Sequence, residues 1–182
     1  MSRISAWIHG LGKEGRTGEP TGPPLKAWQK CLTEIFGTGL GTGYVPRGHG
    51  TAASALLVLL WVWFVPRNAR AEWTAVLALH LAGKPLCDWG ERMWGHDPGR
   101  ITIDEFAGQA VALVGVPRKP LPLLLAFVLF RYFDVFKHLT VRNYIESIPR
   151  GWGTLLDDTV AGFLARAVTG GINPLLGFRK RV

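Results

Sequence analysis

The sequence predicts an all-α protein, a compact multi-helix bundle that is membrane-embedded or membrane-associated. Hydrophobic residues make up 48% of the 182 residues and charged residues only 19%, below the ~25% usual for soluble domains. The apolar residues gather in segments of helical length with little period-two alternation, which disfavours strands. Small residues recur at helical spacing, as they do where membrane helices pack closely.

The chain is expected to form one domain between two tails. Residues 1–25 are rich in Gly, Pro and charge and predict a flexible N-terminal tail, residues 26–172 the helical domain, and residues 173–182 a basic C-terminal tail. No apolar core of signal-peptide length begins the chain, so no cleavable secretion signal is expected. The two cysteines are too few for a disulfide framework and indicate a reducing compartment.

Along the chain, Leu25–Phe36 has helical spacing and is expected to lie on a surface. A glycine-rich loop, Gly37–Thr51, follows it. Ala55–Val65 is the most apolar run, inside a stretch of nineteen uncharged residues, 48–66. This stretch is close to the ~20 residues that cross a bilayer. Pro66–Arg70 closes it with a turn that carries two positive charges.

Four shorter apolar segments follow: Trp73–Leu86, Phe106–Val116, Leu121–Phe130, and one from Thr159 that ends near Ile172. Each is too short to assign as a membrane span and fits a core helix equally well. Two stripes of small residues are expected to bring helix backbones close together. They are Gly108, Ala112 and Gly115 after Asp104, and Gly162, Ala165 and Thr169 after Asp158.

Two pairs of adjacent acids stand where apolar segments begin: Asp104 with Glu105, and Asp157 with Asp158. The simplest interpretation is that each pair complements a helix N-terminus, a contribution of ~0.3–1 kcal/mol. The motifs around the pairs, DEFAG and DDTVAG, are similar. This similarity hints at a repeat but is too short to establish one.

Asp134 is different, because it lies inside the aromatic segment FVLFRYFDVFK. Its simplest role is an ion pair with Arg131, three residues earlier on a helix. Asp88 and Glu91, also three apart, are interpreted as a solvated face. Capping explains each acidic pair separately, but it does not explain an acid inside an apolar helix.

One divalent cation would explain both acidic pairs and Asp134 together. Mg²⁺ takes oxygen ligands and usually keeps waters and substrate phosphate in its shell. The histidines lie in unrelated contexts, so no His/Cys cluster favours a softer metal. Arg131 and Lys137 flank Asp134 and suit phosphate oxygens. The glycine-rich loop with Arg47 and Thr51 precedes a helix start, which favours anions.

The sequence motifs of other phosphate-binding proteins and phosphatases are absent or have the wrong spacing. Gly-x4-Gly-Lys-Ser/Thr and GxGxxG motifs are absent, as is GxSxG. The segment from Cys87 to Arg92 is one residue short of a Cys-x5-Arg loop, and the acids of LLDDTVAG are adjacent rather than Asp-x-Asp. Metal-activated water is therefore the preferred nucleophile, with an aspartate nucleophile as the second possibility.

Three stretches, FGTGLGTGYVPRGHGTAAS, GHDPGRITIDEFAGQ, and FVLFRYFDVFK followed by GWGTLLDDTVAGF, resemble the phosphatidylglycerophosphatase A family in order and spacing. The resemblance implies a Mg²⁺-dependent enzyme of the bacterial inner membrane that hydrolyses phosphatidylglycerophosphate to phosphatidylglycerol and phosphate. The implied metal ligands are Asp97, Asp104, Glu105, Asp134, Asp157 and Asp158, all but Asp97 also catalytic. The implied phosphate-binding residues are Thr51, Arg131 and Lys137.

The chain departs from the family pattern within residues 49–54, 133–140 and 150–153 but keeps every acidic position. These departures bear on substrate preference more than on the reaction.

The charge of +8 suits an anionic lipid surface, and no nucleic-acid partner is expected. Positive charge near Pro66–Arg70 and in both tails predicts that these segments are cytoplasmic, and a cytoplasmic active site follows if the acidic pairs open on that side. The alternatives are a small membrane cation carrier, a phosphatase for another lipid or prenyl phosphate, and a soluble regulatory bundle; the sequence leaves the number of spans and the oligomeric state open.

Overall fold

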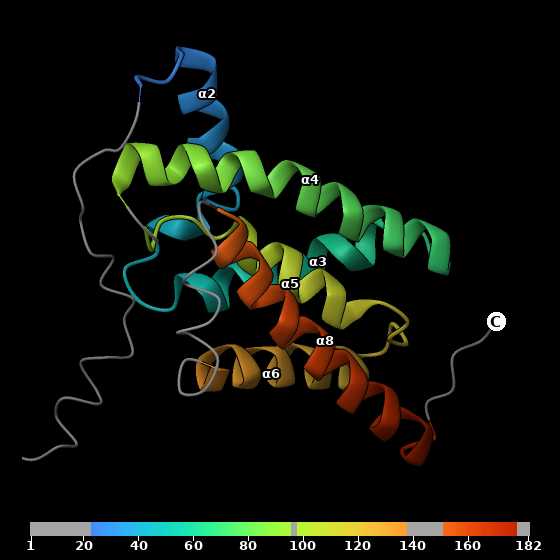
Figure 1. Cartoon of the computed structure of the whole chain (residues 1–182). Helices are drawn as coiled ribbons and strands as arrows, with labels where there is room; N and C mark the ends of the chain where they lie inside the picture. The colour runs from blue at the N-terminus through green and yellow to red at the C-terminus, as the bar shows by residue number, and fades with distance from the viewer. Residues whose placement is uncertain (1–22, 96–97, 138–150, 178–182) are drawn as a thin grey trace, which may run out of the picture.

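The computed structural model describes residues 23–95, 98–137 and 151–177, and within these ranges the chain is helical with no strand. This confirms the all-α prediction for the described part of the chain (Figure 1). The elements are α2 (Ala27–Leu32), a π-helical turn (Thr33–Gly37), a 3-10 turn (Thr42–Tyr44), α3 (His49–Phe64), α4 (Ala69–Trp94), α5 (Ile103–Leu113), α6 (Pro120–Lys137) and α8 (Trp152–Leu175).

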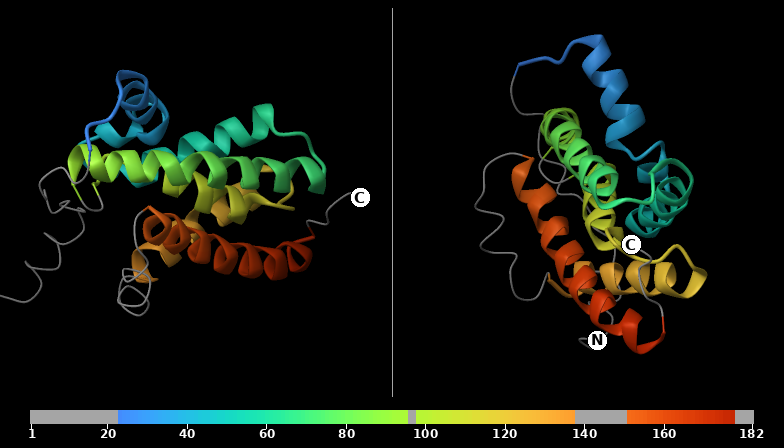
Figure 2. Two further views of the ribbon diagram at one scale, coloured as in Figure 1. Left: turned by 45° about the horizontal axis from the view of Figure 1, so that its top comes forward. Right: turned by 90° about the vertical axis from the view of Figure 1, so that its right-hand side faces the viewer.

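Helix α5 is the centre of the fold. All eleven of its residues are buried, and α3, α4, α6 and α8 each contact it. Figures 1 and 2 show α5 between α3 and α4 on one side and α6 and α8 on the other. A helix that is enclosed on every side needs apolar or small residues all round, and IDEFAGQAVAL provides them everywhere except at its acidic start and at Gln109.

Two glycines allow α5 and α8 to pack backbone against backbone. A methyl group at Gly108 would lie 2.5 Å from the carbonyl oxygen of Asp158, and one at Gly162 would overlap the carbonyl oxygen of Gly108. Close approach along the small-residue faces is therefore confirmed. Gly115 is an exception: α5 ends at Leu113, and Gly115 has a left-handed φ of 79° in the following turn.

Helix α4 is longer than its apolar segment predicted. Asn68 begins it by accepting a hydrogen bond from the backbone N–H of Ala71 at 2.8 Å, and the helix continues through Pro85 to Trp94. Near its C-terminal end, Asp88 pairs with Lys84 and accepts a hydrogen bond from the N–H of Gly151 at 2.9 Å. The interpretation of Asp88 as simply solvated is therefore wrong, because it holds the start of α8.

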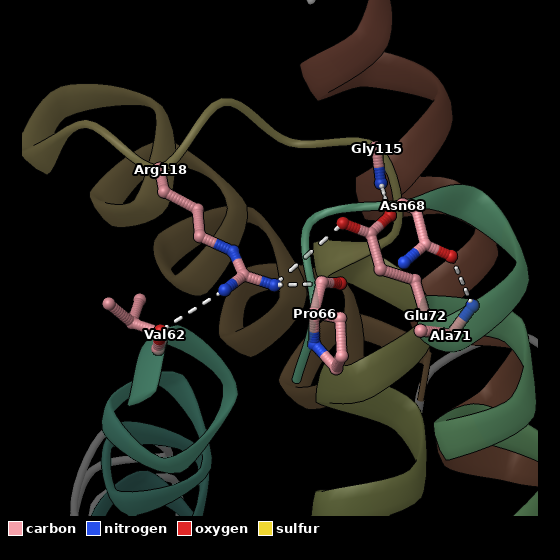
Figure 3. Close-up of polar contacts among 7 residues, drawn as sticks. All are labelled: Val62, Pro66, Asn68, Ala71, Glu72, Gly115 and Arg118. Atoms are coloured by element: carbon pink, nitrogen blue, oxygen red, sulfur yellow. Dashed lines mark hydrogen bonds and ion pairs between the residues drawn. The ribbon is translucent and has the colours of Figure 1, made fainter. Parts of the chain in front are cut away.

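At the opposite end of α5, a buried polar contact fixes two turns (Figure 3). Glu72 accepts a hydrogen bond from the N–H of Gly115 at 2.8 Å and lies 3.9 Å from the guanidinium of Arg118. Arg118 also donates to the carbonyl of Val62 at 3.1 Å. Burial lowers the pKa of Arg118, an effect that the charge of Glu72 opposes. The α3–α4 turn is thereby tied to the α5–α6 turn.

Within the described ranges, none of the helices is both long enough and apolar enough to cross a membrane. The uncharged stretch of residues 48–66 forms the 16-residue helix α3, about 24 Å long at ~1.5 Å per residue, against a hydrocarbon core of ~30 Å. Large apolar side chains nevertheless lie on the surface. The most exposed include Trp63 (81%), Phe64 (76%), Leu81 (64%) and Leu59 (60%).

Candidate metal centre

Three carboxylates converge where α5 and α8 cross. Asp104 and Glu105 come from the first turn of α5 and Asp158 from α8, and one oxygen atom from each lies within 4.8 Å of the other two. Each of the three residues is about 1% exposed. The N–H of Glu105 donates to the Asp104 carboxylate at 3.0 Å, which helps to fix that side chain.

The glycine contact explains why these carboxylates meet. Gly108 lies four residues after Asp104, and Gly162 lies four residues after Asp158, so each glycine is one helical turn beyond its acid on the same face. When the two glycines bring the backbones together, the two acids are brought together as well. This contact explains why the DEFAG and DDTVAG motifs are similar, since in each of them a glycine follows an aspartate by four residues.

Helix capping does not explain the second acidic pair. Helix α8 begins at Trp152, and its first turn contains no acidic residue. Asp157 and Asp158 therefore lie in the second turn, where the effect of the helix dipole is already weak. Asp104 and Glu105 do occupy the first turn of α5, so that dipole favours their charge.

A guanidinium group lies beside the carboxylates. Arg131 of α6 forms an ion pair with Asp134 at 2.7 Å, as the sequence predicted for this spacing. The second residue of α3, Gly50, lies against both groups: a methyl group there would be 2.6 Å from Oε1 of Glu105 and 3.1 Å from both terminal nitrogens of Arg131. The start of α3, the start of α5 and the C-terminal part of α6 thus meet at one point.

The other predicted site residues surround this centre or lie outside the described residues. Asp134 is buried at 3% exposure and Asp157 is half-buried, and their oxygens are not part of the three-carboxylate group. Thr51 is exposed in the first turn of α3, which begins at His49, so Thr51 lies within the helix and not in a loop before it. Lys137 ends α6, with its side chain outside the described part, and Asp97 lies outside the described residues.

Cys87 is a neighbour of the carboxylates that the sequence did not identify. It is 1% exposed, and burial raises its pKa well above the usual range, with further increases from the negative charges of Asp104 and nearby acids. A nucleophilic cysteine requires the opposite surroundings, which lower its pKa. This agrees with the exclusion of thiol chemistry on spacing.

Gly50 was also missed as a site residue. A glycine inside a Gly-rich loop gives no signal that distinguishes a packing role from a turn. The sequence likewise gave no signal for the contacts that His80 and Asp88 make. The ring nitrogens of His80 contact the carbonyl of Val76 and the hydroxyl of Thr159, both at 2.8 Å, so His80 is a packed histidine.

The donor set fits a hard divalent cation. Carboxylate oxygens are the ligands of Mg²⁺, Ca²⁺ and Mn²⁺, whereas zinc and copper sites favour imidazole or thiolate groups. Three carboxylates this close repel one another, and burial strengthens the repulsion. A cation between them, together with the charge of Arg131, would offset most of it.

The fold and the site define a class: an all-helical protein with a buried carboxylate centre of the metal-binding type and an arginine at its edge. Residues 35–173 match the model of the phosphatidylglycerophosphatase A family, and the chain belongs to that family. The resemblance seen in the sequence is thereby confirmed.

Three curated relatives align over most of this chain. The Haemophilus influenzae and Escherichia coli proteins named phosphatidylglycerophosphatase A are each 30% identical, over 72% and 74% of this chain and 82% and 79% of their own lengths. A Bacteroides thetaiotaomicron protein named "Putative phosphatidylinositol-3-phosphatase" is 36% identical over 72% of this chain and 87% of its own. No solved structure shows a significant match. The family and its relatives identify the chain as a phosphatase.

Proposed function

We propose that this protein is a Mg²⁺-dependent hydrolase that converts phosphatidylglycerophosphate to phosphatidylglycerol and inorganic phosphate. The observation that carries the proposal is the group of three buried carboxylates, Asp104, Glu105 and Asp158, beside the Arg131 guanidinium. Family membership supports the phosphatase reaction, and the names of two relatives support the lipid.

In this proposal, Asp104, Glu105 and Asp158 hold the metal, and Asp134, Asp157 and Asp97 complete its shell directly or through waters. Mg²⁺, when bound, supplies positive charge to the phosphoryl oxygens and lowers the pKa of water. Carboxylate oxygens of this set also accept the proton that attacking water releases. Attack by water is the preferred route, and attack by an aspartate is the alternative.

Arg131 is the residue assigned to the phosphate. Its terminal nitrogens lie beside Glu105 and Gly50, where a phosphoryl group bound at the centre would meet them. A guanidinium binds phosphate oxygens through two parallel hydrogen bonds. The ion pair with Asp134 holds this fork in place, so Asp134 acts as a positioning residue in addition to any part in the metal shell.

Thr51 and Lys137 are assigned to the same phosphate from the ends of α3 and α6. The first turn of α3 offers backbone N–H groups and the positive end of a helix dipole, which together favour an anion. Thr51 adds an exposed hydroxyl at this point. Lys137 lies at the last position of α6, six residues or about one and two-thirds turns after Arg131.

The protein is proposed to act at the inner membrane of a bacterium, with the active site on the cytoplasmic side. Exposed Trp63, Phe64 and Leu81 support contact with lipid, since large apolar side chains are stabilised when they leave water for an apolar environment. The net charge of +8 supports attraction to the anionic cytoplasmic leaflet.

The experiment is phosphate release by detergent-purified protein, with Mg²⁺ and with excess chelator. Phosphatidylglycerophosphate and phosphatidylinositol 3-phosphate are compared at equal surface concentration, because one relative's name favours the second lipid. Release from the first lipid that requires Mg²⁺ supports the proposal, and preference for the second replaces the substrate. Absence of release from both, in protein that remains folded, refutes it.

A further inference from the structure

A groove between α3 and α6 lies outside the carboxylate centre. Its volume is about 320 Å³, within the ~300–1,000 Å³ of small-molecule sites. The seven side chains that line it are all apolar: Ala55, Val58, Leu59, Pro120, Leu123, Leu124 and Phe127. Val58 and Leu123 pack against the core and form its floor, while Leu59 and Leu124 are 60% and 56% exposed.

One end of the groove lies one helical turn from the candidate site on both helices. On α6, Arg131 follows Phe127 by four residues, so the apolar stripe leads one turn later to the guanidinium. On α3, Thr51 precedes Ala55 by four residues on the same face. The contact of Gly50 with Arg131 shows that the two helices approach each other at that end. The groove therefore has a polar end at the phosphatase centre and an apolar end away from it.

We propose that this groove holds one acyl chain of the lipid phosphate whose head group lies at Arg131; this rests on the proposed lipid phosphatase function. From Arg131 to Pro120, α6 rises about 16 Å. One acyl chain occupies a similar depth, about half of the ~30 Å hydrocarbon core. A peptide in the groove would leave its backbone N–H and C=O groups without hydrogen bonds, whereas an acyl chain has no such groups.

Acyl-chain length therefore determines affinity when the substrate starts from water. Each methylene that the groove buries is expected to lower KM by up to about fourfold. The test uses wild-type protein and short-chain forms of phosphatidylglycerophosphate, all below the concentration at which they form micelles. The measured quantity is the ratio of kcat/KM for the dioctanoyl form to kcat/KM for the head group without acyl chains.

Ala55→Trp is the test variant, because it places an indole in the groove from an exposed position. Ala78→Trp is the matched control: Ala78 is also exposed on a helix, α4, but does not line the groove. Ala55→Trp is expected to lower the ratio at least tenfold, and Ala78→Trp to leave it at the wild-type value. Equal ratios in the two variants overturn the proposal. A change of oligomeric state in Ala55→Trp alone also overturns it, because it would assign the groove to a second copy of the chain.

A second measurement separates the groove from the reaction. A lipid phosphate with a photoreactive acyl chain is cross-linked to the purified protein, and the labelled peptides are identified by mass spectrometry. Labels within 55–59 and 120–127 support the groove even if no phosphate is released, in which case only the proposed reaction fails. Labels confined to α4 overturn the groove even if the enzyme is active.

Discussion

Arg131 and Asp134 form a 2.7 Å ion pair one turn apart on α6, and the Asp134 side chain is only 5% exposed. The guanidinium of Arg131 also lies near Glu105. The ion pair therefore holds a cationic group, of a kind that can bind phosphate, at the edge of the three-carboxylate group. Asp134 can therefore affect the reaction through Arg131 without touching the substrate.

Asp134→Asn is expected to lower kcat/KM at least tenfold, because the neutral amide no longer holds the guanidinium in place. The double-mutant cycle with Arg131→Lys measures the coupling. If Asp134 acts through Arg131, the double variant loses much less activity than the product of the two single losses. Independent, multiplicative losses would show that Asp134 has a separate role, such as binding the metal.

Asp158→Asn is expected to abolish Mg²⁺-dependent hydrolysis and to weaken the effect of metal on stability. Without divalent ions, removal of one of three clustered negative charges relieves repulsion and raises Tm. With Mg²⁺ the wild-type protein gains stability by binding and the variant gains little, so it is the order of the two Tm values, and not the sign of the metal effect, that reverses between chelator and Mg²⁺. Thermal melts with Mg²⁺ and with chelator measure both effects.

Glu91→Gln is the matched control for this experiment, since Glu91 is an acid of α4 that does not belong to the three-carboxylate group. It should keep the Mg²⁺-dependent rise in Tm and most of the activity. A loss in Glu91→Gln as large as that in Asp158→Asn would mean that the metal centre extends onto α4.

Gly108→Ala is expected to destabilise the protein by about 1–3 kcal/mol, the usual cost of overpacking, because the new methyl group would lie 2.5 Å from the Asp158 carbonyl oxygen. Gly170→Ala is the control on α8, where a methyl group meets nothing within 4 Å. It should be neutral or stabilise by up to about 1 kcal/mol. Denaturant unfolding measures both, and equal effects would show that α5 and α8 do not pack through Gly108.

Cys87 is expected to resist alkylation in the native protein while exposed Cys31 reacts. Because burial raises the native pKa of Cys87, the native state keeps a proton that the unfolded state releases above ~8.5. The stability that this thiol contributes is therefore complete below that pH and declines as pH rises further. Mass spectrometry of labelled protein at pH 7–9, and unfolding of Cys87→Ala against wild type, test this; rapid native labelling of Cys87 at pH 8 contradicts it.

Much of the fold followed from local pattern. The apolar segments indicate α3, α5 and α6, because a helix that packs on a core carries its pattern in its own sequence. Both ends of α5 were placed to within three residues, but α3 begins six residues before its apolar segment and α6 ends seven residues after its own. The start of α8 was missed by seven residues, since Trp152 rather than Thr159 begins it. Its first two turns carry the acidic pair and Gly153, which interrupt the apolar pattern.

The site was predictable only as a set of residue types. Acids beside apolar runs indicated a metal, but which oxygens meet depends on the register of α5 against α8, set by Gly108 and Gly162. Register of this kind is a tertiary property. The Glu72–Arg118 contact was missed for the same reason, because its partners are far apart in the sequence: Glu72 lies at the start of α4 and Arg118 between α5 and α6.

The enclosed position of α5 has a consequence for how the chain is made. Asp158 and the α8 surface that covers α5 are synthesised after α3, α4 and α6, the other helices that contact α5, so a nascent chain ending before α8 presents α5 with one side uncovered. Such surface is prone to aggregation, and contacts between distant segments form slowly. The carboxylate group cannot assemble before α8 docks, so a chain truncated before Trp152 is expected to aggregate and to be inactive, and catalysis is expected to begin only after α8 has been made.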